Sequence, residues 1–535
     1  MRTLSIVEAT IAEHASALSQ GHTNSVELAT KHLLRIAKYD QRSILLNSTP
    51  ITNEHAFETD QASDQRRASG QSLGRLDRIP CTIKDSYKIQ GMTVAFSSPV
   101  FKNLVANEDA FKVKRIKEAG AVILGRTNMP PMAARGMQRG VYGRAESPYN
   151  GKYLTASFAS GTSNGLVTAT AARFGVFDIG EEAISSGRSP ASNNGVLPMT
   201  RRKRVYLART ALCPAPGGRY RQTKDIDALS EANALAGKNI GVPKMYIGGV
   251  DSDPTTRKVH SQQPVIDLRT NTHMIIKGLG ATVEEVDFPV VTKAPPHRNK
   301  ANMCQLMAYA WDDFLPSNGD QNIAASLADI DSSTIFPRPL GSISDKCDSN
   351  NPLVRHTDSV ESRRRSDFKD WVDELGLDAV VFPCNGDVCK ADADVNETSA
   401  AEAWRNGVLY SNGNCVICQL GISAISVPMV VMADVGVPVN LTFASKAYDD
   451  SSLFRYEYSF EKASRLRKAP GRTPQDGDGR RPIRISSTVG EANALRMYVG
   501  GEELKEVKLA GGHWEVAVAT GKNLNEGSSG RVVFV

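Results

Sequence analysis

The sequence has no run of about 18 or more apolar residues, the length that a helix needs to span a membrane. Its mean hydropathy is −0.30. Near the start of the chain, Glu8 and Glu13 interrupt the apolar stretch that a secretion signal would require. We therefore expect a cytoplasmic protein that neither spans nor binds a membrane.

Cysteine is also scarce, since eight cysteines in 535 residues are too few for a disulfide-stabilised scaffold. The pairs Cys384/Cys389 and Cys415/Cys418 have spacings that could hold zinc. Cys384, however, follows the apolar run 379–382, as is typical of a buried free thiol. None of the nine histidines stands in a metal-binding pair. The sequence favours a protein without a metal ion or an organic cofactor.

Charge of one sign is not in large excess, because 64 basic and 58 acidic residues leave a net charge of +6. The basic clusters are short, and none is interleaved with the aromatic side chains that stack on bases. This pattern gives no support to nucleic-acid binding. Apolar residues make up 41% of the chain, enough to bury a large core. The basic clusters lie at residues 201–204, 363–365 and 480–481.

Helices alternate with short apolar strands along most of the chain, which predicts an α/β protein with a largely buried sheet. Two helices are expected in the first 57 residues, the second beginning at a capping box of Asn24 and Glu27. Residues 58–78 are polar and are predicted to form an exposed connection. Further strands are expected at 79–83, 121–124, 379–382, 422–427 and 439–443, and further helices at 110–119, 368–375 and 451–466.

Composition changes near the end of the chain. Residues 468–482 are rich in glycine, proline and charge and are predicted to be a linker. Short strand candidates separated by glycine turns follow, at 495–499, 506–509, 514–518 and 532–535. We expect residues 483–535 to form a small β module appended to a main domain of residues 1–467.

Residues 157–195 contain two loops rich in small and hydroxyl residues, on either side of a predicted helix over 166–173. The first loop holds Thr162 and Ser163, and the second, from Gly180 to Arg188, holds Ser185 and Ser186. Small residues allow backbone N–H groups to face a ligand. Two such loops can bring their hydroxyl groups together, although loops of this composition are also common without function.

With its neighbours, this segment resembles the amidase signature family. The matching residues are a strand that ends in Lys84-Asp85, the loop 160–165, and the loop 180–190, which keeps the family's Ser, Arg and Pro at Ser186, Arg188 and Pro190. Ser186 stands 24 positions after Thr162, the spacing that the family keeps. The resemblance runs from about residue 10 to about 466, with further matches at 119–128 and 436–439. Residues 200–222 and 340–358 fit it poorly.

The resemblance implies a catalytic core over 79–200, with a mixed β-sheet flanked by helices. It also implies that Ser186 is the acylated nucleophile and that Lys84, in its neutral form, is the base. Thr162 replaces the serine that relays a proton between them, and the methyl group of threonine restricts its rotamers. The implied oxyanion hole consists of the backbone N–H groups of Ala183, Ile184, Ser185 and Ser186. Supporting roles fall to Ser163, Glu182 and Arg188.

The implied function is hydrolysis of a small-molecule, linear, non-peptide amide to a carboxylate and ammonia or an amine. Two alternatives stay open. One is acyl or amido transfer, as in a component of a glutamine-dependent amidotransferase, which would need protein partners. The other is a non-catalytic binding or scaffold protein that keeps the fold. The sequence does not fix the oligomeric state, and a homodimer is one arrangement that it allows.

Overall fold

A computed structural model describes most of the chain. The described residues are 5–133, 137–158, 161–182, 185–200, 225, 227–252, 259–288, 303–318, 326–331, 334–336, 368–406, 422–447, 449–475 and six strands between 483 and 534. The segments 200–222 and 340–358, which fit the family pattern poorly, lie almost wholly outside these residues. Among the described residues, no helix has the length and apolar character required to cross a bilayer.

The first sheet contains the strand that ends in Lys84. Its strand order is β1-β3-β2-β4, with β2 parallel to both β3 and β4 and β1 antiparallel to β3. Strands β2 and β3 are buried along their full length, which explains why both begin with apolar residues and carry their charged residues, Lys84 and Arg126, only near their ends. The strands are β1 Ile51–Thr52, β2 Pro80–Lys84, β3 Val122–Thr127 and β4 Phe177–Ile179.

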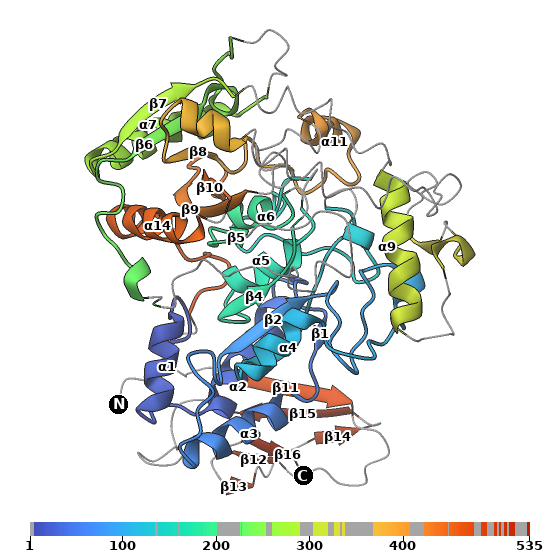
Figure 1. Ribbon diagram of the computed structural model, residues 1–535. Coiled ribbons are helices and arrows are strands. Elements are labelled where there is room, and N and C mark those ends of the chain that lie inside the picture. The colour runs from blue at the N-terminus through green and yellow to red at the C-terminus, as the bar shows by residue number, and fades with distance from the viewer. Residues whose placement is uncertain are drawn as a thin grey trace.

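Alternating side chains of β2 point to opposite faces of this sheet. Cys81 and Ile83 share one apolar cluster with Val113 and Ile116 of α4 (Phe111–Glu118). Thr82 and Lys84 therefore point toward the opposite face, where α5 (Asn164–Ala171) packs against β2 and β4. Helices α2 (Ser25–Arg35) and α3 (Ala56–Ala68) pack beside β3. Figure 1 shows α4 in front of β2.

Helix α3 corrects the prediction that residues 58–78 form an exposed connection, because it covers 56–68 and only the remainder is a turn. Its composition is polar because few positions face inward. Ala56 is buried beside β3, and the Asp64 carboxylate accepts a hydrogen bond from the Ser25 backbone N–H at the start of α2. The helix is stabilised by tertiary contacts with α2 rather than by a clear apolar stripe.

The second sheet has the order β5-β9-β10-β8-β6-β7 and is mixed. Strand β6 is parallel to β7 and β8, and the other pairs are antiparallel. Helices α7 (Gln263–Gly278) and α14 (Asp450–Ser464) pack against it, and their contacts form the largest apolar core. The strands are β5 Met199–Thr200, β6 Asn239–Pro243, β7 Thr282–Val286, β8 Ala379–Pro383, β9 Ser423–Val431 and β10 Pro438–Ser445.

Short helix α6 (Arg188–Ser192) joins the two sheets, since it follows the loop after β4 and packs against β9 and β10. The Asn385 side chain donates to the Ser189 carbonyl, and the Ser192 hydroxyl accepts from the Asn440 backbone N–H. The loop that contains Ser186 is therefore held at both ends, by the first sheet on one side and by the second sheet on the other.

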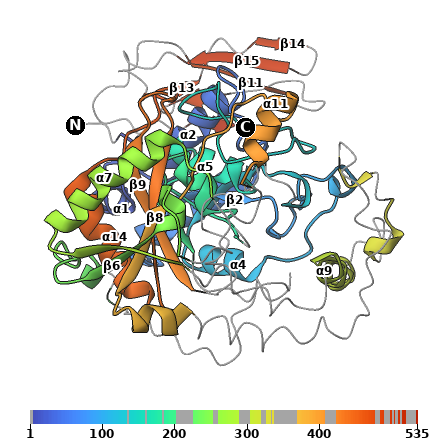
Figure 2. The ribbon, with the colours of Figure 1, turned by 90° about the horizontal axis from the view of Figure 1, so that it is seen from above.

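The other helices lie around these sheets. Helix α9 stands apart from both sheets in the two views (Figures 1 and 2). The remaining helices are α1 Ile11–Ser19, α9 Met303–Asn318, α11 Glu397–Trp404, a helical segment at 368–374, a π-helical turn at Ile36–Asp40, and 3-10 turns at Pro99–Phe101, Pro131–Ala133, Asp227–Leu229, Lys244–Ile247 and Leu327–Asp329.

The C-terminal residues form two three-stranded sheets, with orders β11-β15-β14 and β13-β12-β16. Both lie at the end of the molecule near α2 (Figures 1 and 2). The four predicted strands of this segment are present, together with two that the sequence did not indicate, β11 and β13. The strands are β11 Ile483–Thr488, β12 Met497–Val499, β13 Glu502–Glu503, β14 Lys508–Ala510, β15 His513–Val518 and β16 Val532–Phe534.

The mixed α/β class predicted from the sequence is confirmed. The capping box at Asn24 and Glu27 is present, as are the helix and strand of 111–127 and the helix of α14. The strands of the main domain divide over two sheets.

Candidate active site

Lys84 is the last residue of β2, and its side chain is fully buried. The ammonium group has three neighbours. Its Nζ atom lies 3.4 Å from the Thr162 hydroxyl, 3.1 Å from the Ser163 hydroxyl and 2.7 Å from the Glu181 carboxylate. An ammonium that is withdrawn from water requires partners of this kind, because an unpaired buried charge is costly. The structure thus brings together Lys84, Thr162 and Ser163, as the sequence predicts.

Thr162 and Ser163 lie in the turn that leads into α5. Both side chains are buried. The backbone N–H of Ser163 donates to the backbone carbonyl of Ser186, at 3.0 Å. This bond joins the loop of Thr162 directly to the loop of the proposed nucleophile. It holds the two loops in register independently of their side chains.

Ser186 lies in the turn before α6 and is partly exposed. Among the described residues, its hydroxyl group has no hydrogen-bonding partner, so the Thr162–Ser186 step of the implied relay is open. Catalytic hydrogen bonds are often long or absent without substrate and form when it binds. The neighbouring Ser185 hydroxyl is buried and lacks a partner within the described part of the chain. Of the implied oxyanion-hole residues, Ala183 and Ile184 lie outside the described residues.

Glu182 and Arg188 form a buried ion pair across the loop of Ser186. The Arg188 Nε atom donates to the Glu182 carboxylate at 2.9 Å, and the Arg188 backbone N–H donates to the other carboxylate oxygen at 3.2 Å. Both side chains are almost fully buried. Paired in this way, the two residues, six positions apart in the chain, close the loop of Ser186, consistent with the supporting role predicted for them.

Glu181 is the site residue that the sequence reasoning missed. One of its carboxylate oxygens contacts Lys84, and the other accepts a hydrogen bond from the Ser86 hydroxyl at 2.8 Å. About a quarter of the side chain is exposed. The signal that could have identified it is the pair of consecutive acids, Glu181-Glu182, where the family pattern requires only one. A carboxylate in contact with an ammonium stabilises the charged form of that ammonium.

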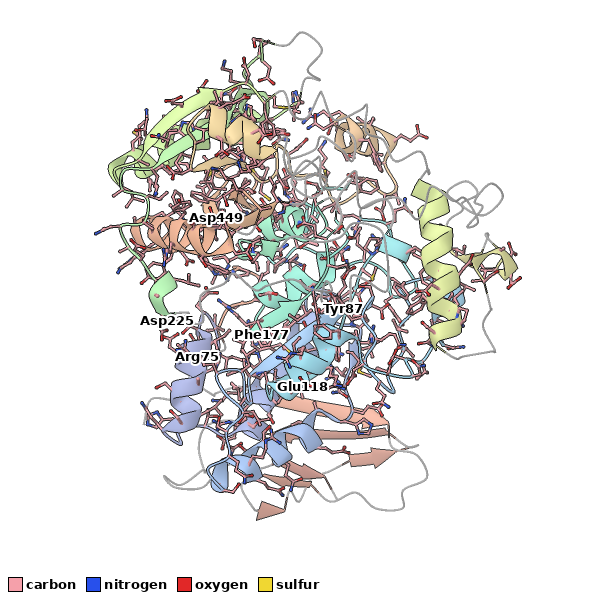
Figure 3. The ribbon with its side chains drawn as sticks, viewed as in Figure 1. Arg75, Tyr87, Glu118, Phe177, Asp225 and Asp449 are labelled. Carbon is pink, nitrogen blue, oxygen red and sulfur yellow. The ribbon has the colours of Figure 1, made fainter. Side chains whose placement is uncertain are left out.

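Tyr87 ties β2 to the same loop. Its hydroxyl donates to the Gly180 carbonyl at 2.8 Å, and burial raises its pKa well above the ordinary value, with a further contribution from the Glu181 charge. Tyr87 and Phe177, the latter on β4, lie in the middle of the molecule (Figure 3) and contribute to one apolar cluster. The chain just after Lys84 is therefore anchored to the start of the Glu181 loop.

A second buried ion pair, Asp85 with Arg126, also fixes the chain just after Lys84. The Arg126 guanidinium donates to the Asp85 carboxylate and to the carbonyls of Asp85 and Tyr87. Burial raises the pKa of the Asp85 carboxyl, although the adjacent guanidinium opposes this effect. The second Asp85 oxygen accepts from the Ser97 N–H. These contacts restrain the backbone next to Lys84.

No group of three or more potential metal ligands occurs within the part of the chain that the structure describes. Cys384 and Cys389 are buried thiols, and Cys384 donates to the Arg188 carbonyl. Burial raises the pKa of Cys389 to about 12. Cys415 and Cys418 lie outside the described residues.

Known proteins resemble this chain in sequence and in fold. Residues 27–198 match the family model described as Amidase. Among curated proteins, a glutamyl-tRNA(Gln) amidotransferase subunit of Azotobacter vinelandii is 30% identical over 322 residues, which cover 54% of this chain and 62% of that protein. The corresponding protein of Neorickettsia sennetsu is 26% identical, and its match covers 54% of this chain and 63% of that protein. These matches thus span less than two thirds of the relatives' length.

Longer matches are weaker in identity. The mitochondrial counterpart from Mus musculus is 23% identical, covering 85% of this chain and 93% of that protein. Among solved structures, the peptide amidase of Stenotrophomonas maltophilia superposes with a TM-score of 0.70 at 20% identity, covering 86% of this chain and 98% of that one. The 6-aminohexanoate cyclic dimer hydrolase has a TM-score of 0.66 at 17% identity, covering 87% and 99%. At this level of identity, the superpositions establish the fold.

Proposed function

Because the chain belongs to the amidase signature family, we propose that it is an amidase that cleaves a small carboxylic amide through an acyl-enzyme on Ser186. The observation that carries this proposal is the contact of a fully buried lysine, Lys84, with Thr162, whose loop is hydrogen-bonded to Ser186. A serine hydroxyl needs an adjacent base to become a nucleophile, and a buried lysine is a known alternative to histidine.

In the proposed reaction, the Ser186 oxygen attacks the amide carbonyl carbon. The hydroxyl proton of Ser186 passes to the Thr162 oxygen while the Thr162 proton passes to the neutral Lys84 amine. The resulting tetrahedral oxyanion is stabilised by backbone N–H groups of residues 183–186. Of these residues, Ser185 and Ser186 lie in the turn just before α6, and the Glu182–Arg188 pair holds the loop closed.

The carbon–nitrogen bond then breaks, and the leaving nitrogen takes a proton back from Lys84 through Thr162. A water molecule attacks the acyl-enzyme, again giving a proton to Lys84 through the relay. Collapse of the second tetrahedral intermediate returns that proton to Ser186 and releases the carboxylic acid, which then loses its own proton to water or to the released amine. Each proton that Lys84 accepts is thus returned within one cycle, and the chemistry needs no oxidant or other co-reactant.

The first step requires Lys84 without its extra proton, whereas the Glu181 carboxylate stabilises the ammonium. We infer that the ion pair belongs to the resting protein and separates before the attack. Movement of the Glu181 side chain is sufficient for this, since it is partly exposed while Lys84 is fully buried.

A second candidate function is acyl or amido transfer, in which an amine or ammonia rather than water resolves the acyl-enzyme. The names of the curated relatives favour it, because they are components of an amidotransferase. Catalysis of that kind would need protein partners. A third candidate, a binding or scaffold protein, draws support from the open step between Thr162 and Ser186 and from the Lys84–Glu181 pair.

Assay of a panel of primary carboxamides, with ammonia and carboxylate both measured, tests the proposal. We expect ammonia release in water alone, in equal amount to the carboxylate, and none from Ser186→Ala. Product formation only when an amine acceptor is added would instead support transfer. No product under either condition, from a protein that is folded, would support the scaffold.

A further inference from the structure

Asp178 is outside the proposed catalytic group, but its carboxylate contacts the strand and helix elements that lead to each catalytic residue. Asp178 lies on β4 directly opposite Thr82 of β2 in the parallel pairing. One oxygen of its carboxylate accepts from the Thr82 backbone N–H, at 3.0 Å, and from the Thr82 hydroxyl. The other oxygen accepts from the Thr170 hydroxyl of α5. Asp178 thus joins two strands of the first sheet to the helix that packs on them.

Each of these elements runs directly into one part of the proposed site. Thr82 is two residues before Lys84 on the same face of β2. Thr170 is on the helix that begins just after Thr162 and Ser163. Strand β4 ends one residue after Asp178, and the chain continues into the loop that reaches Ser186. No other side chain that we find in the described part of the chain bonds to all three elements.

We propose that Asp178 is a positioning residue that fixes the three elements carrying Lys84, Thr162 and Ser186 in one reactive arrangement. The inference rests on the proposed function, because the arrangement matters only if Ser186 is acylated. Its physical basis is that a relay of two proton transfers works only when three heavy atoms are placed within hydrogen-bonding distance together. A displacement of about 1 Å can cost about a hundredfold in rate.

The chemistry of the contact suits a carboxylate. All three of its partners donate, and an ionised carboxylate is an acceptor at both oxygens. A protonated carboxyl must itself donate from one oxygen, and it can do so without losing a contact only if the Thr170 hydroxyl turns its proton to the Leu166 carbonyl, 3.0 Å away. Desolvation raises the pKa of Asp178 to about 6, and the hydrogen bonds from Thr170 and Thr82 limit that rise. The charged or titratable groups around it are Cys81 of β2 and Arg173 beyond α5, which pairs with Glu8.

The test uses variants that change one bond at a time. Thr82→Val and Thr170→Val keep the branched shape and remove one hydroxyl donor each. Asp178→Asn keeps the shape of the acid and replaces one acceptor oxygen with a donor, so that it can accept from one threonine only. Thr30→Val is the matched control, because it removes a helix threonine hydroxyl that donates to the Val26 carbonyl on α2.

The first readout is the rate at which a fluorophosphonate labels Ser186. We expect Asp178→Asn to react at least about tenfold more slowly than the native protein, and each valine variant to react more slowly as well. When Thr82→Val or Thr170→Val is added to Asp178→Asn, the labelling rate should fall by less than the sum of the two single effects predicts. The reason is that the three groups act as one unit. As the pH drops through about 6, the native rate should fall more steeply than the rate of Asp178→Asn, because only the native protein has the Asp178 carboxylate to lose. Thr30→Val should behave like the native protein.

The second readout, backbone hydrogen exchange measured by mass spectrometry, does not depend on activity. Asp178→Asn should speed exchange in three segments at once, namely Pro80–Lys84, Asn164–Ala171 and Phe177–Ile179, whereas Thr30→Val should not. Native labelling rates in Asp178→Asn, or faster exchange confined to β4, would overturn the inference. Absence of labelling in the native protein would overturn the proposed function, and the exchange pattern would still decide whether Asp178 joins the three elements.

Discussion

The ammonium of Lys84 and the carboxylate of Glu181 form an ion pair of 2.7 Å inside the proposed catalytic group. Lys84 is fully buried and Glu181 is partly exposed, so Glu181 is the partner that can leave. In the proposed mechanism, this contact has to break before Lys84 can act as a base.

We therefore expect Glu181→Gln to increase the reactivity of Ser186. The neutral amide no longer forms an ion pair with the Lys84 ammonium, so this contact no longer has to break before Lys84 acts as a base. The expected gain in the rate of fluorophosphonate labelling is about threefold to tenfold. A lower rate in a folded variant would contradict this role and would indicate that Glu181 positions Lys84 for the reaction.

Glu182→Gln, one residue further on, should have the opposite effect. It removes the partner of Arg188 and leaves a fully buried guanidinium without its counter-charge. Loss of one member of a buried pair costs about 3–5 kcal/mol, so we expect a lower free energy of unfolding and slower labelling. Urea unfolding of the two variants side by side measures the contrast. Equal stability of Glu182→Gln and the native protein would show that the pair does not hold the loop.

Substitutions of Thr162 test the proton relay. Thr162→Val keeps the branched shape but removes the hydroxyl, and we expect labelling to slow by about a hundredfold or more. Thr162→Ser keeps the hydroxyl and removes the methyl group that restricts its rotamer, so it should react at least as fast as the native protein. If Thr162→Val labels at the native rate, Lys84 does not act through Thr162.

The pair His14 and His32, at the interface of α1 and α2, predicts sensitivity to acid. Both side chains are fully buried, and burial lowers the pKa of His14 to about 4 and that of His32 to about 3. Both pKa values lie below the unfolded value of 6.5, so the two neutral histidines contribute fully to the free energy of unfolding above pH 6.5. This contribution is lost as the pH falls toward 4. We expect the free energy of unfolding to decrease by an amount on the order of a few kcal/mol between pH 7 and pH 4.

Urea unfolding at several pH values measures this loss. Neither ring nitrogen of His14 has a partner among the described residues, so a His14→Leu variant should fold. Its free energy of unfolding should decrease less between pH 7 and pH 4 than that of the native protein. His22→Gln, at an exposed position between the same helices, is the control and should leave the loss unchanged. A His14→Leu variant with the full native loss would exclude His14 as a source of the effect.

The sequence predicted the elements whose patterns are local. Strand β2 is a buried apolar run, and α14 has an amphipathic stripe, so both were predicted to within a few residues. Helix α3 was not predicted because its residues are mostly polar and show no clear apolar stripe. Its formation depends on contacts with α2. The division of the strands over two sheets was not predicted either, because pairing such as β5 with β9 depends on residues far apart in the chain.

The same distinction applies to the site. Lys84, Thr162 and Ser186 were predicted because their spacing matches a family pattern, and the structure places Lys84 in contact with Thr162. Glu181 and Asp178 were not, because their importance depends on where β4 brings their side chains relative to β2. A sequence shows that an acid is present, whereas its distance from a lysine or a threonine is a property of the fold.

The most direct test of the central claim is intact-mass analysis of the folded protein after reaction with a fluorophosphonate. We predict a single adduct that maps to Ser186 and is absent from Ser186→Ala and from Lys84→Met. A folded native protein that acquires no adduct, or an adduct that persists in Ser186→Ala, would contradict the assignment of Ser186 as an activated nucleophile.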